Sequence, residues 1–156
     1  MTSVKLQSIA EAEKGSLFSI CLEGDSISEF EKFVQKHNES YSKDLNTILT
    51  AIKRMLEVSG FLERYFRPEG KYNDRVCALP IDSGKLRLYC VRINDSILIA
   101  GNGGVKKAQK YQDCDNLNGY VVTLQNLDKA LKIAIKRGEV TIEERKFNPK
   151  DKDFEL

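Results

Sequence analysis

The chain has 156 residues, of which 41% are hydrophobic and 31% are charged, and its formal net charge is +2. This composition is typical of one folded globular domain and excludes an intrinsically disordered chain. No segment approaches the roughly 20 apolar residues of a membrane-spanning helix, and the first residues lack the apolar core of a signal peptide, so we expect a cytoplasmic protein without a membrane partner.

The first third of the chain predicts a strand and then a helix. Residues 1–15 are polar and weakly patterned, and we expect a loose arm or a short helix there. The apolar run Leu17–Leu22 is typical of a buried strand. A short amphipathic helix should begin after Ser26 or Ser28, because a serine oxygen can accept a hydrogen bond from a free amide of the first helical turn.

The second helix carries the clearest periodic pattern in the chain. Ser40 or Ser42 can cap its start, and Gly60 can end it in a left-handed conformation. Its apolar positions keep the helical period: Tyr41, Leu45, Ile48, Leu49, Ile52, Met55 and Leu56. The two helices should form an αα-hairpin whose apolar faces need a sheet to cover them.

Three strands of an antiparallel meander follow. We expect them at Arg75–Ile81, Leu86–Ile93 and Ser96–Gly101, with Pro80 making the first an edge or irregular strand. The glycine-rich residues 101–104 should end the third strand in a turn that needs positive φ. Side chains of the middle strand alternate between two faces, neither of them purely apolar or polar, so both faces should be partly covered.

The last part of the chain predicts a third helix, at about residues 124–137. Thr123 or Asn126 can cap it, and Gly138 can end it. A short strand can follow, and the charged tail 143–156 should be loosely ordered. The whole pattern predicts a single domain of the α+β class, with an N-terminal strand, an αα-hairpin, a three-stranded antiparallel meander and an additional C-terminal helix.

Positive charge gathers on the expected meander. Residues 60–111 contain ten Lys and Arg against five Asp and Glu, which gives this segment a charge of +5. Such an excess attracts anionic partners, although an ordinary solvated face has the same composition. The four cysteines lack metal-ligand spacing, and we interpret His37, the only histidine, as a solvated surface residue. We therefore expect neither a metal nor a cofactor.

Lys, Arg and Tyr are the remaining candidates for functional side chains. RNA carries its own nucleophile, the 2′-hydroxyl group, so a protein can cleave RNA by holding the sugar and phosphate for in-line attack. Arginine binds phosphate oxygens bidentately, lysine supplies charge or a base, and tyrosine stacks on a base or handles a proton. A nuclease without a catalytic histidine is consistent with these residue types.

The order of elements and three short motifs resemble the RelE/ParE/HigB toxin superfamily of bacterial toxin–antitoxin modules. The motifs are Phe66–Pro68 before the meander, Lys85–Cys90 in its middle strand, and Ile97–Gly101 followed by Gly104–Lys107. The resemblance covers about residues 17–112. Family members of the RelE and HigB type cut mRNA on the ribosome, ParE members poison DNA gyrase, and most are silenced by an antitoxin.

The resemblance implies a toxin-like endoribonuclease that acts on ribosome-bound mRNA and has a cognate antitoxin, expected to be of the helix-turn-helix type. The implied catalytic residues are Arg87, Lys106, Lys107 and Tyr111. The implied RNA-binding residues are Lys71, Arg75, Tyr89 and Arg92. The chain departs from the family pattern because it is longer at both ends and adds a helix, and because Tyr111 is only a candidate for the family's C-terminal catalytic side chain.

Each of these residues also has a structural interpretation. Arg87 can be a strand arginine paired with Asp82 or Glu69, and Tyr89 can be a core residue. The pair Lys106–Lys107 can belong to an exposed turn. The alternative functions are a gyrase-directed toxin that binds without catalysis and an inactive interaction module with the same fold.

Overall fold

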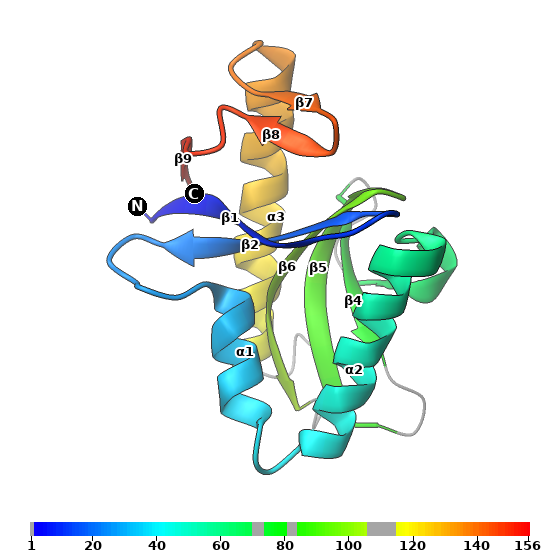
Figure 1. Cartoon of the computed structure of the whole chain (residues 1–156). Coiled ribbons are helices and arrows are strands. Elements are labelled where there is room, and N and C mark those ends of the chain that lie inside the picture. Colours follow the sequence, from blue (N-terminus) through cyan, green and yellow to red (C-terminus); the bar gives the residue numbers. More distant parts are fainter. Residues whose placement is uncertain (1, 70–73, 81–83, 106–114) are drawn as a thin grey trace.

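The computed structural model describes residues 2–69, 74–80, 84–105 and 115–156. These residues form a mixed sheet with helices on both of its faces (Figure 1). Within this part of the chain, no helix is both long and apolar enough to cross a membrane.

Seven strands make up the main sheet. They are β1 (Ser3–Glu11), β2 (Ser16–Leu22), β3 (Arg67–Pro68), β4 (Val76–Pro80), β5 (Leu86–Asn94), β6 (Ile97–Val105) and β9 (Asp153–Glu155). Their order across the sheet is β3-β4-β5-β6-β2-β1-β9. Neighbouring strands are antiparallel except β2 and β6, which run parallel. The parallel pair joins the β4–β6 meander to the N-terminal hairpin.

Two helices pack on one face of this sheet. α1 (Glu29–His37) is capped by Ser28, whose hydroxyl accepts a hydrogen bond from the amide three residues later at 3.2 Å. α2 (Ser42–Arg54) continues into a π-helical turn (Met55–Ser59) that ends at a glycine with positive φ. Their inward side chains meet the sheet in an apolar core that includes Leu17, Phe33, Leu45, Ile48, Leu88 and Leu98.

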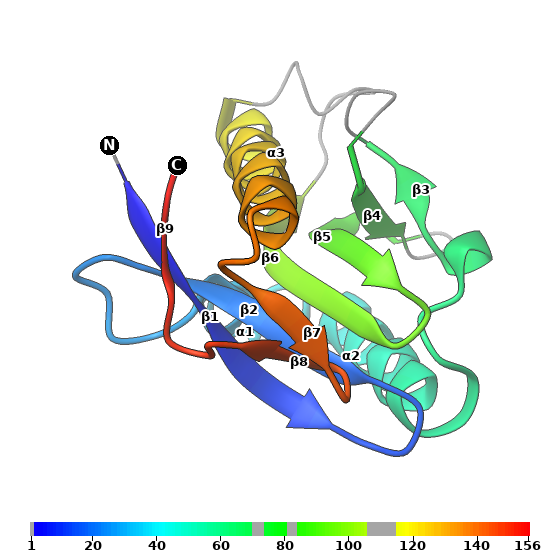
Figure 2. The same cartoon turned by 90° about the horizontal axis from the view of Figure 1, so that it is seen from above.

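The opposite face of the sheet is covered by α3 (Asp115–Lys136), as Figure 2 shows. Apolar side chains of this helix recur at helical spacing and are buried against β4, β5 and β6. This second core includes Tyr89, Val91, Ile99, Leu124, Leu127 and Leu131. Both faces of β5 are therefore covered, as its mixed pattern predicts.

The C-terminal residues return to the sheet. β7 (Thr141–Glu143) and β8 (Lys146–Asn148) form a hairpin, and β9 then pairs antiparallel with the start of β1. Phe147 and Phe154 are buried in the core on the α3 side. These two phenylalanines explain why a tail rich in charged residues is ordered, since each buries a large apolar side chain.

The predicted α+β class is confirmed, with a mostly antiparallel sheet and a C-terminal helix. Several details differ from the sequence-based expectation. The sequence predicts a loose arm or short helix for residues 1–15, whereas residues 3–11 form a strand. It predicts a loosely ordered tail at 143–156, whereas this tail contains β8 and β9.

The helix boundaries also differ in part from the prediction. Ser28 is the cap of α1, as one of the two predicted alternatives has it. The N-cap residue of α2 is Tyr41, whose side chain makes no capping hydrogen bond, so neither Ser40 nor Ser42 has the expected role. α3 begins well before the predicted start near residue 124. Its first turns contain asparagines and a glycine, which have low helix propensity and hide the helix in the sequence. Packing on the sheet outweighs this low propensity.

Candidate functional site

The eight residues selected from the sequence divide into two groups. Four lie outside the described residues, so the structure gives no position for Lys71, Lys106, Lys107 and Tyr111. The other four belong to or adjoin the meander: Arg75, Arg87, Tyr89 and Arg92. The geometry of this second group decides what the described part of the candidate site can do.

The start of β5, where Arg87 lies, is held by α2. The Asp44 carboxylate in the first turn of α2 accepts hydrogen bonds from the amides of Lys85 (2.9 Å) and Leu86 (3.4 Å). This contact fixes the main chain immediately before Arg87. Sequence analysis missed Asp44, because the residues it binds are more than 40 positions away and no local pattern links them.

Arg87 is half-buried, and its hydrogen bonds go to the main chain. Its Nη1 donates to the carbonyl oxygens of Gly84 (3.1 Å) and Leu86 (2.9 Å). Its Nε is buried and has no hydrogen-bond partner among the described residues. None of the ion pairs observed between described residues involves Arg87; Asp82, one of the partners considered, lies outside the described residues.

The strand beside Arg87 is β6, and its glycines bring two backbones together. The sequence predicts a turn with positive φ at residues 101–104, but β6 continues through them to Val105, and none of these glycines has positive φ. A Cβ atom on Gly103 would lie 1.9 Å from the carbonyl oxygen of Arg87, and one on Gly104 would lie 3.0 Å from Leu117. These glycines are therefore required by close packing rather than by a turn.

Tyr89 belongs to the core. Its side chain is 0% exposed and packs in the apolar cluster between β5 and α3. A side chain in this position cannot stack on an RNA base unless the helix moves away. The structural interpretation of Tyr89 therefore describes the folded protein better than the RNA-binding one.

Arg75 joins the start of β4 to α3. Its Nε donates to Asp128 Oδ1 at 2.7 Å, and its amide donates to Asp128 Oδ2 at 3.1 Å. Asp128 is 1% exposed and also pairs with Lys132 at 3.1 Å. Because a buried carboxylate is stable only when charged or hydrogen-bonding groups compensate it, Arg75 has a structural role.

Arg92 is tied to the segment that follows the π-helical turn. Its Nε donates to the carbonyl oxygen of Phe61 at 2.7 Å, and its guanidinium also pairs with Asp95. The amide of Phe61 in turn donates to the carbonyl oxygen of Asp95. Arg92 thus joins the end of β5 to Phe61 and Asp95, and its side chain does not extend freely into solvent.

The side chains of Arg75, Arg87 and Arg92 do not gather at one place on the meander. Arg75 and Arg92 lie side by side, since the amide of Arg92 donates to the carbonyl of Arg75 at 3.1 Å. Arg87 is five residues earlier in β5, about 16 Å along the strand, and on the opposite face from Arg92. Arg87 is therefore the candidate among these three whose charge has no carboxylate partner within the described part of the chain.

His37 is buried, which corrects its interpretation as a surface residue. It is 3% exposed, and its ring lies between those of Phe33 and Tyr41, with centroid distances of 5.1 and 5.9 Å. Burial lowers the pKa of His37 below its usual value, and the charge of Lys36 lowers it further. The side chain is thus held neutral by its surroundings.

Cys77 and Cys90 face each other across β4 and β5 as buried free thiols. Burial raises the pKa of Cys77 to about 12 and also raises that of Cys90. Both therefore remain protonated and unreactive. Among the described residues, no group of three or more His, Cys, Asp or Glu side chains is arranged to hold a metal ion.

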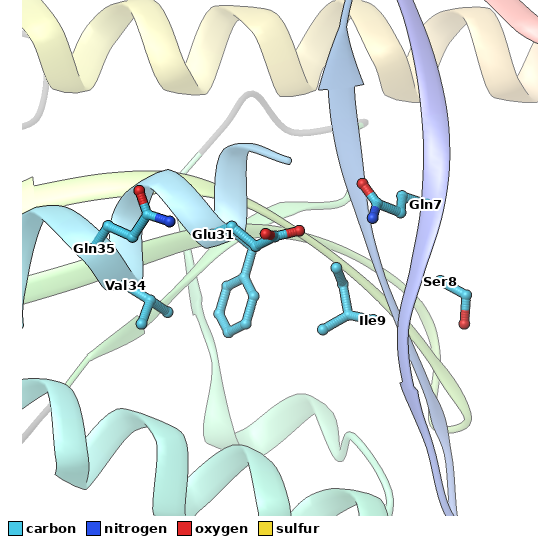
Figure 3. Close-up of a pocket in the computed structure, with 7 residues that line it drawn as sticks. Gln7, Ser8, Ile9, Glu31, Val34 and Gln35 are labelled. Carbon is cyan, nitrogen blue, oxygen red and sulfur yellow. The ribbon is translucent and has the colours of Figure 1, made fainter. Parts of the chain in front are cut away.

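A pocket of about 380 Å³ lies between β1 and α1. Figure 3 shows Gln7 and Ile9 of the strand facing the side chains of α1, with the side chain of Ser8 on the side of β1 away from α1. The lining residues are Gln7, Ser8, Ile9, Phe30, Glu31, Val34 and Gln35. Sequence analysis missed this pocket, because it did not predict that residues 3–11 form a strand.

The chain matches no protein-family model, no curated protein and no solved structure.

Proposed function

We propose that this protein is a toxin-like endoribonuclease of a bacterial toxin–antitoxin module, which acts in the cytoplasm on ribosome-bound mRNA and arrests growth. The proposal rests on the sequence resemblance to the RelE/ParE/HigB superfamily over about residues 17–112. It is supported by the order of elements in that part of the chain, in which a strand, two helices and a three-stranded meander follow one another. A cognate antitoxin, expected to be of the helix-turn-helix type, would keep it silent.

The observation that carries the proposal is the set of hydrogen bonds that Arg87 makes with the described residues. Among the described residues, this half-buried guanidinium binds only main-chain oxygens. One of its buried N–H groups has no described partner, which is unusual because buried donors are nearly always satisfied. A phosphate group of RNA would accept hydrogen bonds from the partly exposed guanidinium and would supply a negative charge that no described carboxylate provides. Arg87 would then stabilise the charge that develops on the phosphate during attack by the 2′-hydroxyl group.

The other candidate residues enter the proposal unequally. Lys106, Lys107 and Tyr111 follow β6 in the chain, and β6 pairs with the start of β5 near Arg87, so they remain the proposed source of further charge and of a proton-transfer group. Lys71 remains a proposed RNA contact. Arg75, Tyr89 and Arg92 have internal roles and leave the proposed site.

The second candidate is a toxin that binds its target, such as DNA gyrase, without cleaving RNA. The partners of Arg75 and Arg92 favour it, because two of the expected RNA-binding cations are already neutralised by aspartates. An inactive interaction module with the same fold is the third. DNA-damage signalling without new RNA ends would identify the gyrase-directed toxin, and an absence of growth arrest would identify the inactive module.

The test is induction of the wild type and of an Arg87→Ala variant in a bacterial host, with growth and amino-acid incorporation followed together. We expect the wild type to stop growth within one or two generations and the variant to allow it. The matched control is Arg137→Ala, since Arg137 is an exposed arginine beyond the C-terminal end of α3. That control should remain as toxic as the wild type.

Folding of the Arg87 variant must be separated from its activity. The side chain holds the carbonyls of Gly84 and Leu86, so its loss can disturb the start of β5. Circular dichroism and urea unfolding of Arg87→Ala and Arg87→Lys identify a variant that is folded. Growth arrest by a folded Arg87→Ala variant equal to that of the wild type would refute the proposed role of Arg87.

A further inference from the structure

The outer edge of β1 is only half covered. β9 pairs with residues 3–5 of this strand, and within the described part of the chain no strand pairs with the outer side of residues 6–11. Figure 2 shows this second half of β1 at the rim of the sheet. An uncovered edge presents main-chain donors and acceptors that can pair with another strand.

The direction of these main-chain groups follows from the hydrogen bonds at the start of β1. The carbonyl of Ser3 accepts from the amide of Glu23 on the β2 side, whereas the carbonyl of Thr2 accepts from the amide of Leu156 on the outer side. Because alternate residues of an antiparallel strand direct both groups to the same side, the amide and carbonyl of Ser8 point outward. Ser8 lies next to a β-bulge and its side chain is exposed.

The pocket of Figure 3 adjoins this edge on the α1 side. Its apolar lining comes from Ile9, Phe30 and Val34, and its volume of about 380 Å³ is enough for one aliphatic side chain. A strand added beside Ser8 would place alternate side chains on the pocket side. Main-chain pairing and a side-chain pocket are thus offered at the same place, which is the arrangement used to bind extended peptides.

The negative charge at the pocket rim indicates which kind of segment can bind there. The pocket rim carries Glu31, which forms no ion pair with any described residue. Glu11, at the end of β1, is already paired with Arg145 and Lys146, so Glu31 supplies the negative charge at the pocket. Lys5, the lysine of β1, pairs with Asp153 of β9. A second copy of this chain would bring an identical glutamate to the pocket rim, whereas a peptide with lysine or arginine beside its apolar residue would complement Glu31.

We propose that the outer edge of β1 and the adjoining pocket bind an extended segment of a partner protein, by strand addition, with an apolar side chain in the pocket and a basic residue beside Glu31. β9 already occupies the neighbouring part of the same edge in this way. None of the residues that line the pocket or form this edge is among the candidate nuclease residues, so this proposal is independent of the proposed nuclease activity.

The test uses a blocked seven-residue peptide that alternates leucine or valine with lysine, titrated into the 15N-labelled full chain and followed by NMR. We expect saturable shifts confined to residues 6–11 and to α1. Replacing the peptide lysines with glutamates should weaken binding about fivefold, as expected for the loss of a solvent-exposed charge pair. Methylating alternate peptide amides should abolish it, because this removes the main-chain donors.

Variants of the chain complete the test. Ser8→Pro removes an outward amide without removing a β1–β2 hydrogen bond, and it should weaken binding about tenfold. Val34→Arg should block the pocket, whereas its matched control, Val122→Arg at an exposed position of α3, should bind as the wild type does. Glu31→Lys should reverse the preference towards the glutamate peptide.

Three results would overturn the proposal. The first is a lack of saturable binding to the wild type. The second is binding that a folded Ser8→Pro variant retains in full. The third is a dimer of the free chain, detected by light scattering, that Ser8→Pro converts into a monomer, because the edge would then bind a second copy and not a partner peptide.

Discussion

Aspartates on the helices fix the segments that enter the sheet. Asp44 in α2 binds the amides at the start of β5, and Asp128 in α3 binds Arg75 at the start of β4. Both contacts connect residues far apart in the sequence, so neither is visible in a local pattern. The alternation along β5 could be predicted, and Leu88 and Tyr89 do lie on opposite faces of the sheet. What the sequence does not show is which arginines have an internal aspartate partner.

At the same scale, His37 predicts a dependence of stability on pH. The folded state lowers its pKa, so the unfolded chain binds a proton more readily. Above the usual pKa of about 6.5 both states are neutral and His37 has no effect on stability. As pH falls below that value the unfolded state gains protons first and stability drops, until pH passes below the folded pKa. Urea midpoints of the wild type should therefore fall between about pH 7.5 and pH 5.5.

The control for this prediction is His37→Phe, which keeps an aromatic ring between Phe33 and Tyr41 but cannot titrate. Carboxylates elsewhere in the chain affect the two proteins alike, so the difference between their pH profiles isolates His37. A wild-type profile parallel to that of the variant would mean that the pKa of His37 is the same in the folded and the unfolded state, which would contradict the prediction.

At the scale of elements, β6 can pair with β5 as far as Val105 only because Gly103 lets the two backbones approach closely. Gly103→Ala would place a methyl group against the carbonyl of Arg87, where backbone and not a flexible side chain must move. We expect a loss of about 2 kcal/mol of unfolding free energy, which urea unfolding measures. The matched control is Gly119→Ala in α3, whose methyl group would meet nothing within 4 Å.

The control should change stability in the other direction. Alanine at position 119 reduces the conformational freedom of the unfolded chain and favours the helix, so we expect a gain of about 0.5–1 kcal/mol. Equal stability of Gly103→Ala and the wild type would mean that β5 and β6 can separate at this point without cost. That result would contradict the close approach described for Arg87 and Gly103.

The C-terminal hairpin of β7 and β8 is an element that the sequence could not predict. Its turn places Glu144 and Arg145 at φ of 51° and 64°, although neither is a residue that favours positive φ. Arg145 compensates by donating to the carbonyls of Ala12 and Glu13. Because these contacts come from the other end of the chain, a charged tail with weak turn signals gives no sequence indication of a hairpin.

For the whole molecule, the sheet separates two apolar cores, one under α1 and α2 and the other under α3. The α+β class could be predicted from the periodic apolar patterns of Leu45–Ile52 and of the meander strands. The position of β1 and β9 at the rim could not, because pairing between the two ends of a chain depends on tertiary contacts such as those of Val4 and Phe154. The candidate site was only partly predictable, since Arg75 and Arg92 have aspartate partners whereas Arg87 has no carboxylate partner among the described residues.

The most direct test of the proposed function is to map RNA ends on translating ribosomes. Wild-type protein made in a cell-free system is added to ribosomes stalled on a defined mRNA, and new 5′ ends are located by primer extension. We predict cuts within the ribosome-bound codons, and a rate at least about 100-fold lower for a folded Arg87→Ala variant, as expected when one group that stabilises developing charge is removed. No cuts by the wild type, or equal cutting by the variant, would contradict the account.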